Sequence, residues 1–370
     1  MFKSRFWKNF DWVLFGAALA LSLVGVVVIY STSFKAANLV APVDAAHQVY
    51  FLVIALVGFG LAARMDYRGW SKVTPVLYVA MLVSLLAVFV LGKTALGATR
   101  WIDLGFFQFQ PSEFAKIVMI LVLAKYFSAN YDSMDRIRPV AISLLYVAVP
   151  GLLVLAQPDL GTALVFGAIW LVMAIMAQVR WTYFAALFGA AVVSLPIFIQ
   201  FVLKPYQRAR LEVFLNPTAD PLSTGYNVVQ STIAVGSGQL YGRGLAAGSQ
   251  SQLNFLPSQH TDFIFAVLSE KMGFIGGLIV LLLFTVLLLR GIYIASRAED
   301  RFGVFVAVGV VTMLLFHLFI NIGMNIGLMP VTGIPLPFIS YGGTSLLVSL
   351  IAVGLLESIA IRRKKIQFGS

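Results

Sequence analysis

Three short stretches of an otherwise apolar sequence carry carboxylates and cations that could do chemistry. Asp262 ends the sequence "HTD" directly before a long apolar run, and Asp159 lies in "QPDLGT". Glu113 and Lys116 stand three residues apart in "QPSEFAK". A carboxylate can take a proton from a hydroxyl, and a nearby cation can stabilise a leaving anion. Because ionisable side chains at membrane depth are costly, these residues predict a functional site.

Each of these residues also has a structural interpretation. Asp262 and Asp159 can cap the helices that follow them, since a carboxylate suits a helix N-terminus. Glu113 and Lys116 lie on one helix face and can form a local ion pair. For Asp262 the two interpretations are compatible, because a helix N-terminus at a membrane cleft is a suitable place for a functional carboxylate.

Other polar residues within apolar segments favour structural roles. His317, Asn321 and Asn325 are four residues apart, which gives one polar stripe suited to hydrogen bonds between helices. Glu270 and Lys271 are adjacent, so their side chains point about 100° apart on a helix and need separate partners.

The composition indicates a membrane protein. Of 370 residues, 60% are hydrophobic and 11% are charged, and the mean hydropathy is +0.93. A soluble domain carries about 25% charged residues. The absence of cysteine excludes thiolate metal sites, iron–sulfur clusters and disulfides. The sequence contains no Walker A, HExxH or GxSxG motif. Nothing in it therefore indicates ATP-driven transport, zinc hydrolysis or serine hydrolysis.

The apolar segments predict an all-α polytopic membrane protein with about ten transmembrane helices. We expect a single domain over residues 1–370, with a retained first span rather than a signal peptide. The predicted spans are 12–30, 48–63, 73–92, 112–128, 139–157, 160–178, 182–203, 262–289, 303–327 and 344–361.

The distribution of Lys and Arg predicts the orientation. With both termini cytoplasmic, about 17 basic residues fall on the inner side and about seven on the outer side, as the positive-inside rule requires. The excess of positive charge (+11) is therefore an orientation signal, and we expect no nucleic-acid partner. This orientation places the carboxylate-bearing motifs on the extracytoplasmic face.

One long extracytoplasmic loop, about 204–261, is rich in Gly, Ser and Gln. We expect an ordered cap with short amphipathic segments on the bilayer surface. Arg208, Arg210 and Arg243, together with Lys204, suit anionic head groups or a diphosphate, although solvation of an ordinary loop explains them equally well.

Several long motifs resemble the SEDS proteins (shape, elongation, division and sporulation). They are "RWIDLGFFQFQPSEFAK", "AQPDLGT", "YQRARLEVFLNPTADPLSTGYNVVQSTIAVGSG", "SQLNFLPSQHTDFIFAV" and "PLPFISYGGTS", in the family's order and over nearly the whole chain. "GSQSQLNFLP" resembles the elongation branch of the family. The sequence departs from many relatives at Ser258, where they have Glu.

This resemblance implies a peptidoglycan glycosyltransferase of the bacterial cytoplasmic (inner) membrane. Such an enzyme polymerises lipid II into β-1,4 glycan strands for cell elongation and rod shape, and it releases undecaprenyl diphosphate. Asp262 matches the family's essential aspartate. Because a β-linkage formed from an α-linked donor requires inversion, Asp262 is expected to act as the general base for the attacking hydroxyl.

The resemblance also implies roles for the remaining motif residues. Lys116, Arg208 and Arg210 are candidates to neutralise the diphosphate, with Glu113 holding Lys116. A divalent cation (Mg²⁺ or Mn²⁺) held by Asp262 and Asp159 is a further expectation. Other residues expected in the substrate cavity are His260, Ser340 and Tyr341.

The expected partners are lipid II, the nascent glycan, the elongation machinery and a class B penicillin-binding protein, a transpeptidase with one membrane helix. Spans eight and nine, with Gly276 and Gly277, are expected to dock that helix. A lipid II flippase is the alternative function, and a scaffold without catalysis is another.

Overall fold

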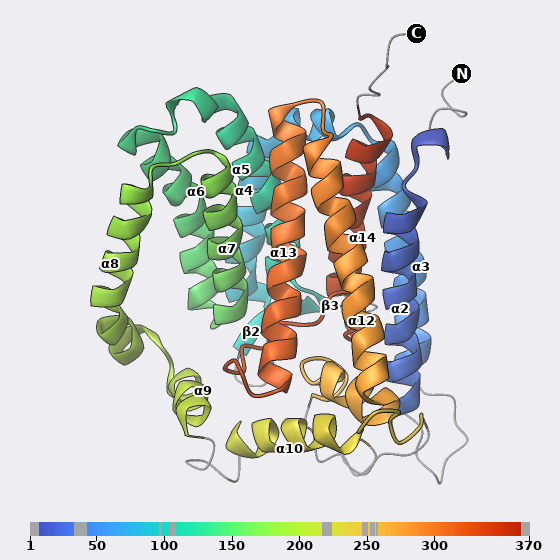
Figure 1. Ribbon diagram of the computed structural model, residues 1–370. Helices are drawn as coiled ribbons and strands as arrows, with labels where there is room; N and C mark the ends of the chain where they lie inside the picture. Colours follow the sequence, from blue (N-terminus) through green and yellow to red (C-terminus); the bar gives the residue numbers. More distant parts are fainter. Residues whose placement is uncertain are drawn as a thin grey trace.

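The computed structural model describes residues 7–32, 43–95, 98–103, 105, 108–216, 224–245, 251, 256 and 258–363. Within these residues eight helices are long and apolar enough to cross a membrane. Two further helices, α5 and the shorter apolar α7, also match predicted spans, so ten helices match the ten predicted spans. The predicted all-α polytopic fold is confirmed (Figure 1). These helices are α2 (Trp12–Thr32), α3 (Val43–Arg64), α4 (Tyr67–Leu91), α5 (Pro111–Asn130), α6 (Ile137–Ala156), α7 (Leu160–Met176), α8 (Trp181–Ile197), α12 (Ile264–Ser296), α13 (Arg301–Asn325) and α14 (Gly343–Ile361).

Several helices begin or end outside the predicted apolar spans. α3 begins at Val43 instead of residue 48, and α4 begins at Tyr67 instead of residue 73. The Asp66 side chain accepts a hydrogen bond from Arg68 N and so caps α4 before its apolar part begins. Hydropathy locates the hydrocarbon-spanning part of a helix, whereas caps determine where the helix itself starts.

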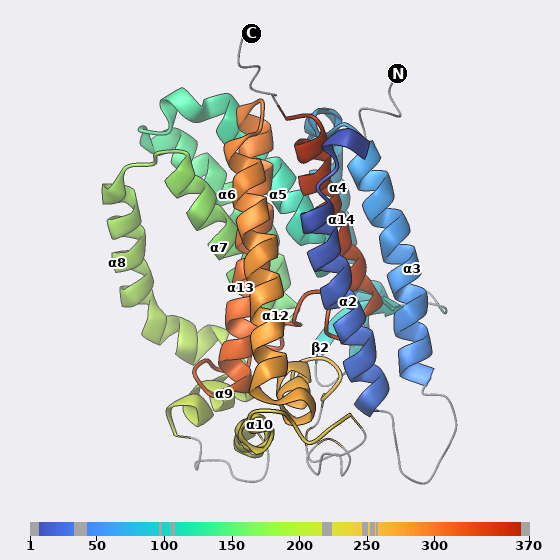
Figure 2. The same ribbon diagram turned by 45° about the vertical axis from the view of Figure 1, so that its right-hand side comes forward.

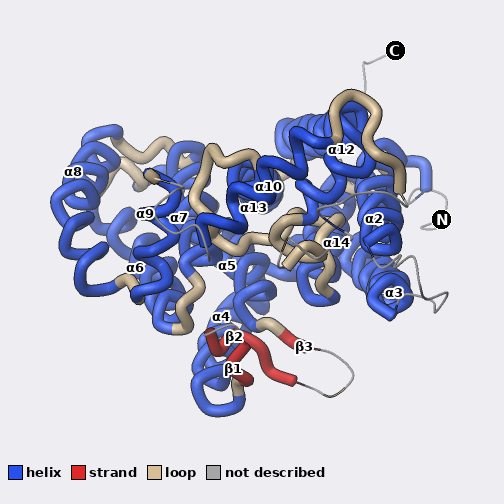
Figure 3. Tube along the Cα trace, turned by 90° about the horizontal axis from the view of Figure 1, so that it is seen from below, coloured by secondary structure: helices blue, strands red, loops and turns tan. Residues whose placement is uncertain are grey.

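The short elements gather at one end of the bundle. The start of α2 and the end of α14 lie at the opposite end, as an even number of spans requires (Figures 1 and 2). A small antiparallel sheet, not predicted from the sequence, stands at one side of the bundle beside α4 (Figure 3). The short elements at this end are β1 (Lys93–Ala95), β2 (Ala98–Asp103), β3 (Gln108–Phe109), α9 (Pro205–Leu215) and α10 (Thr224–Ser237). η2 (Phe198–Val202) joins α8 to α9, and η1 (Tyr131–Ser133) follows α5.

α13 and α14 form the centre of the bundle. In the most apolar 18-residue stretch of each helix, 72% of the residues are buried in α13 and 78% in α14. α14 packs along α3, and α13 packs against α5, α7 and α12. α8 stands apart from the bundle, and none of its residues is buried (Figure 1). The central pair therefore provides the rigid support for the end at which the short elements lie.

α12 is two helical arms that fold back on each other at Gly273. This residue has φ 67° and ψ −165°, a backbone conformation suited to glycine. A Cβ placed on Gly277 would lie 3.5 Å from Phe265 Cζ. In a straight helix these residues would be about 18 Å apart along the axis. Gly276 and Gly277 are buried, so the prediction that they form an outward docking face is wrong.

Main-chain hydrogen bonds from the preceding loop fill the break in α12. Arg243 N and Gly244 N donate to the carbonyls of Glu270 and Lys271 (both 3.0 Å). Phe274 N and Ile275 N donate to the carbonyls of residues 239 and 240 (2.8 and 3.1 Å). Backbone groups released by the break are thereby satisfied, as burial in a membrane protein requires.

Glu270 and Lys271 bind separate partners, as predicted. Glu270 Oε2 accepts a hydrogen bond from Ser251 N (3.1 Å), and Lys271 Nζ donates to the carbonyls of Ser31 (3.2 Å) and Leu245 (3.0 Å). Both residues tie the loop to the first arm of α12, so their role is structural.

Candidate active site

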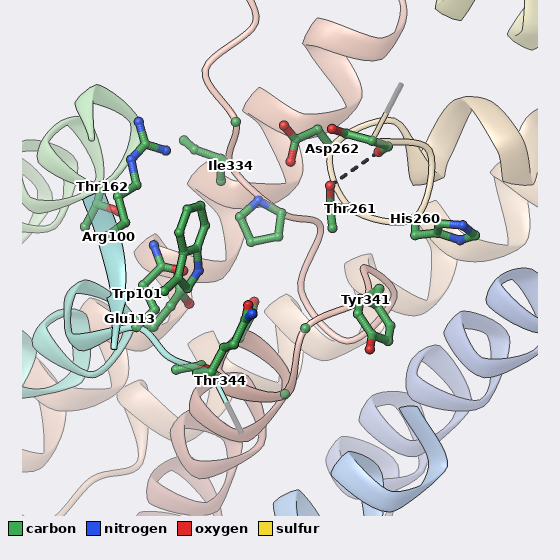
Figure 4. A pocket seen from close by; sticks show the side chains of 18 of the residues that line it. Arg100, Trp101, Glu113, Thr162, His260, Thr261, Asp262, Ile334, Tyr341 and Thr344 are labelled. Carbon is green, nitrogen blue, oxygen red and sulfur yellow. Dashed lines mark hydrogen bonds between the residues drawn. The ribbon is translucent and has the colours of Figure 1, made fainter. Parts of the chain in front are cut away.

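A cavity of about 1130 Å³ opens at the end of the bundle that carries the short elements. It exceeds the range of about 300–1,000 Å³ usual for a single small ligand. Figure 4 shows Arg100 and Thr162 on one side, His260 and Tyr341 on the other, and Asp262 between them. Its principal polar and aromatic lining residues are Asp44, His47, Tyr50, Phe51, Arg100, Trp101, Asp103, Glu113, Lys116, Asp159, Tyr206, Arg210, His260, Asp262, His317 and Tyr341.

Asp262 lines this cavity and does not cap α12. The N-cap residue is Phe263, which makes no side-chain cap. The cap comes from another helix, because Asn325 Oδ1 on α13 accepts the hydrogen bond of Ala266 N–H in the first turn (3.0 Å). The capping interpretation of Asp262 is therefore wrong, and its carboxylate is available to the cavity.

Two asparagines of α13 fix the backbone at Asp262. Asn321 Nδ2 and Asn325 Nδ2 both donate to the Asp262 carbonyl, at 3.1 and 3.0 Å. Asn321 Nδ2 also donates to the Ile334 carbonyl (2.8 Å). The predicted polar stripe on this helix does make interhelical hydrogen bonds, and its function is to position Asp262.

The surroundings of Asp262 change its acidity in opposing directions. Burial raises the pKa of its carboxyl group, while Arg210, hydrogen bonding by Thr261, and Arg100 each lower it. A Cβ on Gly333 (φ +77°) would lie 3.6 Å from Asp262 Oδ2 and 4.0 Å from Arg210 Nη1. A methyl group here would be in van der Waals contact with both charged groups, and the positive φ favours glycine.

Arg100 and Arg210 form the cationic side of the cavity. Arg100 Nη2 donates to the Pro158 carbonyl, which also accepts the Tyr206 hydroxyl (3.1 Å). Arg210 Nη1 donates to the Val331 carbonyl (3.1 Å), and its guanidinium group lies 5.7 Å from the centroid of the Tyr206 ring. Burial lowers the pKa of Arg210, although arginine stays protonated.

Sequence reasoning missed Arg100 and selected Arg208 instead. Arg208 is directed away from the cavity, since its guanidinium donates to the carbonyls of Leu203 (3.0 Å) and Gln200. Residues two apart on a helix point about 200° apart, so Arg208 and Arg210 cannot both face one cavity. The available signal for Arg100 was its place in "RWIDLG", shortly before the predicted site on α5.

Glu113 and Lys116 form the predicted pair, and His317 joins them. Lys116 Nζ lies 2.6 Å from Glu113 Oε1 and 2.9 Å from His317 Nε2. His317 Nδ1 lies 2.6 Å from the Met313 carbonyl, which leaves Nε2 as the acceptor for Lys116. All three side chains are buried. The ammonium group is thus fixed, with one of its three hydrogens left for the cavity.

Asp159 caps α7, as its structural interpretation predicted. Its carboxylate accepts hydrogen bonds from Thr162 N (3.2 Å), Thr162 Oγ1 (2.8 Å) and Ser112 Oγ (3.2 Å). It also lines the cavity. These bonds occupy most of its acceptor capacity, and the described residues contain no cluster of three His, Asp or Glu side chains that could hold a metal. The residues do not fit a protein-built cation site, and the divalent cation stays a prediction.

His260, Ser340 and Tyr341 hold the opposite wall together. His260 Nδ1 lies 2.9 Å from Thr32 Oγ1, and Tyr341 N donates to the His260 carbonyl (2.8 Å). Ser340 Oγ donates to the Thr261 carbonyl (2.7 Å) and accepts from Leu336 N. Ser340 is a positioning residue, whereas His260 and Tyr341 line the cavity. The whole arrangement can remove a proton at Asp262 and stabilise an anion at the arginines.

Comparisons with known proteins agree with this fold. The family model of FtsW, RodA and SpoVE, described as cell cycle protein, matches residues 11–365. The peptidoglycan glycosyltransferase MrdB of Escherichia coli (strain K12) is 40% identical over 368 residues, covering 98% of this chain and 97% of that protein. Stage V sporulation protein E of Bacillus subtilis (strain 168) is 40% identical over 358 residues, covering 95% and 96%.

Two solved structures are similar over nearly the whole chain. One belongs to a study of the structural coordination of polymerization and crosslinking by a peptidoglycan synthase complex. It has a TM-score of 0.80 and 30% identity, covering 95% of this chain and 97% of the other. The crystal structure of the rod shape determining protein RodA of Thermus thermophilus has a TM-score of 0.71 and 28% identity, covering 96% and 98%.

Proposed function

The chain belongs to the FtsW/RodA/SpoVE family of cell cycle proteins, and we propose from this membership and from the site that it is a peptidoglycan glycosyltransferase. It is a multi-pass membrane protein with a role in cell elongation. One observation carries the mechanism: the Asp262 carboxylate lines the same cavity as Arg100 and Arg210. It does not cap α12, because Asn325 provides that cap.

The reaction joins two lipid II-derived saccharides with inversion. The acceptor 4-hydroxyl oxygen attacks the anomeric carbon of the donor from the face opposite the diphosphate. The new C–O bond forms as the bond to the diphosphate oxygen breaks, and Asp262 takes the hydroxyl proton. Undecaprenyl diphosphate leaves with the bonding electrons, and no covalent enzyme intermediate is needed.

The cationic side of the cavity suits the departing diphosphate. Arg100 and Arg210 each present a planar guanidinium group there, and such groups bind phosphate oxygens with two parallel hydrogen bonds. Lys116 contributes a buried positive charge at a position fixed by Glu113 and His317. Preorganised cations of this kind stabilise charge that develops in the transition state.

A flippase is less well supported than a polymerase. A translocation path needs polar groups through the depth of the bilayer, and His317 marks the inner limit of the polar stripe on α13. Beyond it, towards the start of the helix, Gly309 packs closely against Ile120 and Met173. Apolar core surrounds this part of α13. The polar stripe of α13 therefore lies towards the end of the molecule that carries the cavity.

We further infer that the site faces the extracytoplasmic side of the bacterial cytoplasmic membrane. The predicted inner loops are the basic ones, and the cavity lies at the other end of the bundle. A class B penicillin-binding protein is the expected partner, because polymerised glycan must be crosslinked. The exposed apolar face of α12 is a better docking surface than the buried glycines; it includes Phe274, Leu278, Leu282 and Leu289.

Polymerisation of lipid II by the purified protein tests the proposal. Asp262→Asn keeps the size of the side chain, so we expect normal unfolding and a rate at least about 100-fold lower. Glu212→Gln, an exposed α9 carboxylate outside the cavity lining, is the matched control and should polymerise normally. Glycan synthesis by Asp262→Asn near the unmutated rate would overturn the base assignment. Transbilayer movement of lipid II without polymerisation by the unmutated protein would favour the flippase.

A further inference from the structure

The two sides of the cavity differ in charge: Arg100 and Arg210 form one side, and the opposite wall carries different side chains. This wall comes from the start of α3 and from the segment before α14. Asp44, His47 and Phe51 stand at i, i+3 and i+7 on α3, which places them on one helix face. Neither lysine nor arginine contributes to this wall among the described lining residues, so it does not suit a diphosphate.

Aromatic rings line this wall in a continuous series. The His47 and Phe51 ring centroids are 6.3 Å apart, and the Phe51 and Tyr341 centroids are also 6.3 Å apart. The Tyr50 ring adjoins Phe51 at 5.9 Å and is 52% exposed. Rings in such an arrangement present apolar faces at the edge of a polar cavity.

Polar groups accompany the rings. The Tyr341 hydroxyl makes no hydrogen bond to any other described residue in the structure. Burial raises the pKa of Tyr341 and lowers that of His260, and the nearby Asp44 carboxylate raises both. Asp44, His260 and Tyr341 all line the same cavity. A carboxylate, a phenol and a neutral imidazole beside aromatic faces match the hydroxyl groups and the apolar face of a hexose.

The stereochemistry of inversion assigns this wall to one of the two saccharides. The attacking hydroxyl and the leaving diphosphate lie on opposite sides of the anomeric carbon. If the diphosphate binds at Arg100 and Arg210, then the acceptor approaches from the other side of the cavity. His260 and Tyr341 lie on that side, with Asp262 between them and Arg100 (Figure 4).

We propose that Asp44, His47, Phe51, His260 and Tyr341 form the acceptor subsite, which binds the neutral sugar ring that carries the attacking hydroxyl. This inference rests on the proposed function and extends it, because it separates the acceptor from the donor within one cavity. The cavity volume of about 1130 Å³ supports it, since two saccharides must be bound together.

Single-turnover substrates separate the two roles. A lipid II whose 4-hydroxyl is capped by galactose can only donate, and an analogue with a phosphonate in place of the anomeric phosphate ester can only accept. The unmutated protein should join them into one capped tetrasaccharide, so KM can be measured for each partner. Failure to form this product would refute the proposed glycosyltransferase function itself.

Asp44→Asn and Tyr341→Phe test the subsite. Each should raise the KM for the acceptor about 10-fold, as the loss of one good hydrogen bond predicts, with the KM for the donor unchanged. Ala46→Asn adds the same amide to an exposed α3 position outside the lining and should change neither KM. Arg100→Gln should raise the KM for the donor only. An increase confined to the donor KM, or no change in folded Asp44→Asn and Tyr341→Phe proteins, would overturn the assignment.

Discussion

Asn325→Leu should impair both stability and catalysis, although Asn325 does not line the cavity. The substitution keeps the approximate volume but removes the amide that caps α12 from α13. Ala266 N–H then loses its acceptor in a buried position, which costs about 1–3 kcal/mol. The Asp262 carbonyl loses one of its two asparagine donors, worth about 1 kcal/mol. We expect a total loss of about 2–4 kcal/mol in the free energy of unfolding.

The catalytic consequence follows from the position of the cap. The first turn of α12 comes directly after Asp262, so a shift of that turn moves the carboxylate. A displacement of about 1 Å at a reacting group can reduce a rate about 100-fold. We expect a decrease of about 10- to 100-fold in the polymerisation rate at saturating lipid II.

Thr312→Val is the matched control for this experiment. Thr312 is buried on the same helix, and its hydroxyl bonds only within the helix, to the Val308 carbonyl (2.8 Å). Both variants should be compared by chemical unfolding in detergent and by glycan synthesis. If Asn325→Leu unfolds and polymerises like Thr312→Val, then the cap from α13 does not position Asp262.

Four other perturbations test the site. Arg210→Gln removes a positive charge that lowers the pKa of Asp262, so the acidic limb of the pH–rate profile should move to higher pH; a shift to lower pH would contradict this reasoning. Glu113→Ala and Lys116→Ala should each abolish most activity, with the double variant little worse than either, whereas additive losses would mean that they act separately. Gly333→Ala should reduce activity and cost about 1–2 kcal/mol of stability, measured by unfolding, because the residue has positive φ and faces both charged groups. Chelation by EDTA should leave the unfolding temperature unchanged, since the described residues build no metal cluster; a lower temperature would reveal one.

The spans were predictable because a bilayer demands long apolar segments, and each predicted span has a helix. The break at Gly273 was not predicted, because apolar residues on both sides of Glu270 and Lys271 make the segment look like one span. The available signals were this charged pair and the glycine two residues after it.

The site was predictable in residue type but less so in role. Motif positions identified Asp262, Lys116 and Asp159, all of which line the cavity. The cap on α12 was missed because the residue that accepts its hydrogen bond, Asn325, stands about 60 residues away in the sequence. Arg100 was missed because the small sheet that directs it into the cavity has no strong pattern of its own.

The fold-back of α12 has a consequence for how the protein responds to its lipid environment. A straight helix of 33 residues would be about 50 Å long, against a hydrocarbon thickness of about 30 Å. The break leaves residues 274–296, about 35 Å, to match the bilayer, while the first arm is enclosed by protein. A thicker or thinner bilayer should therefore tilt the long arm and move residues 239–244, which are hydrogen-bonded to the break, with it. Asp262 is hydrogen-bonded to α13 and should remain in place. A change in acyl-chain length is therefore expected to move residues 239–244 before it moves the catalytic carboxylate.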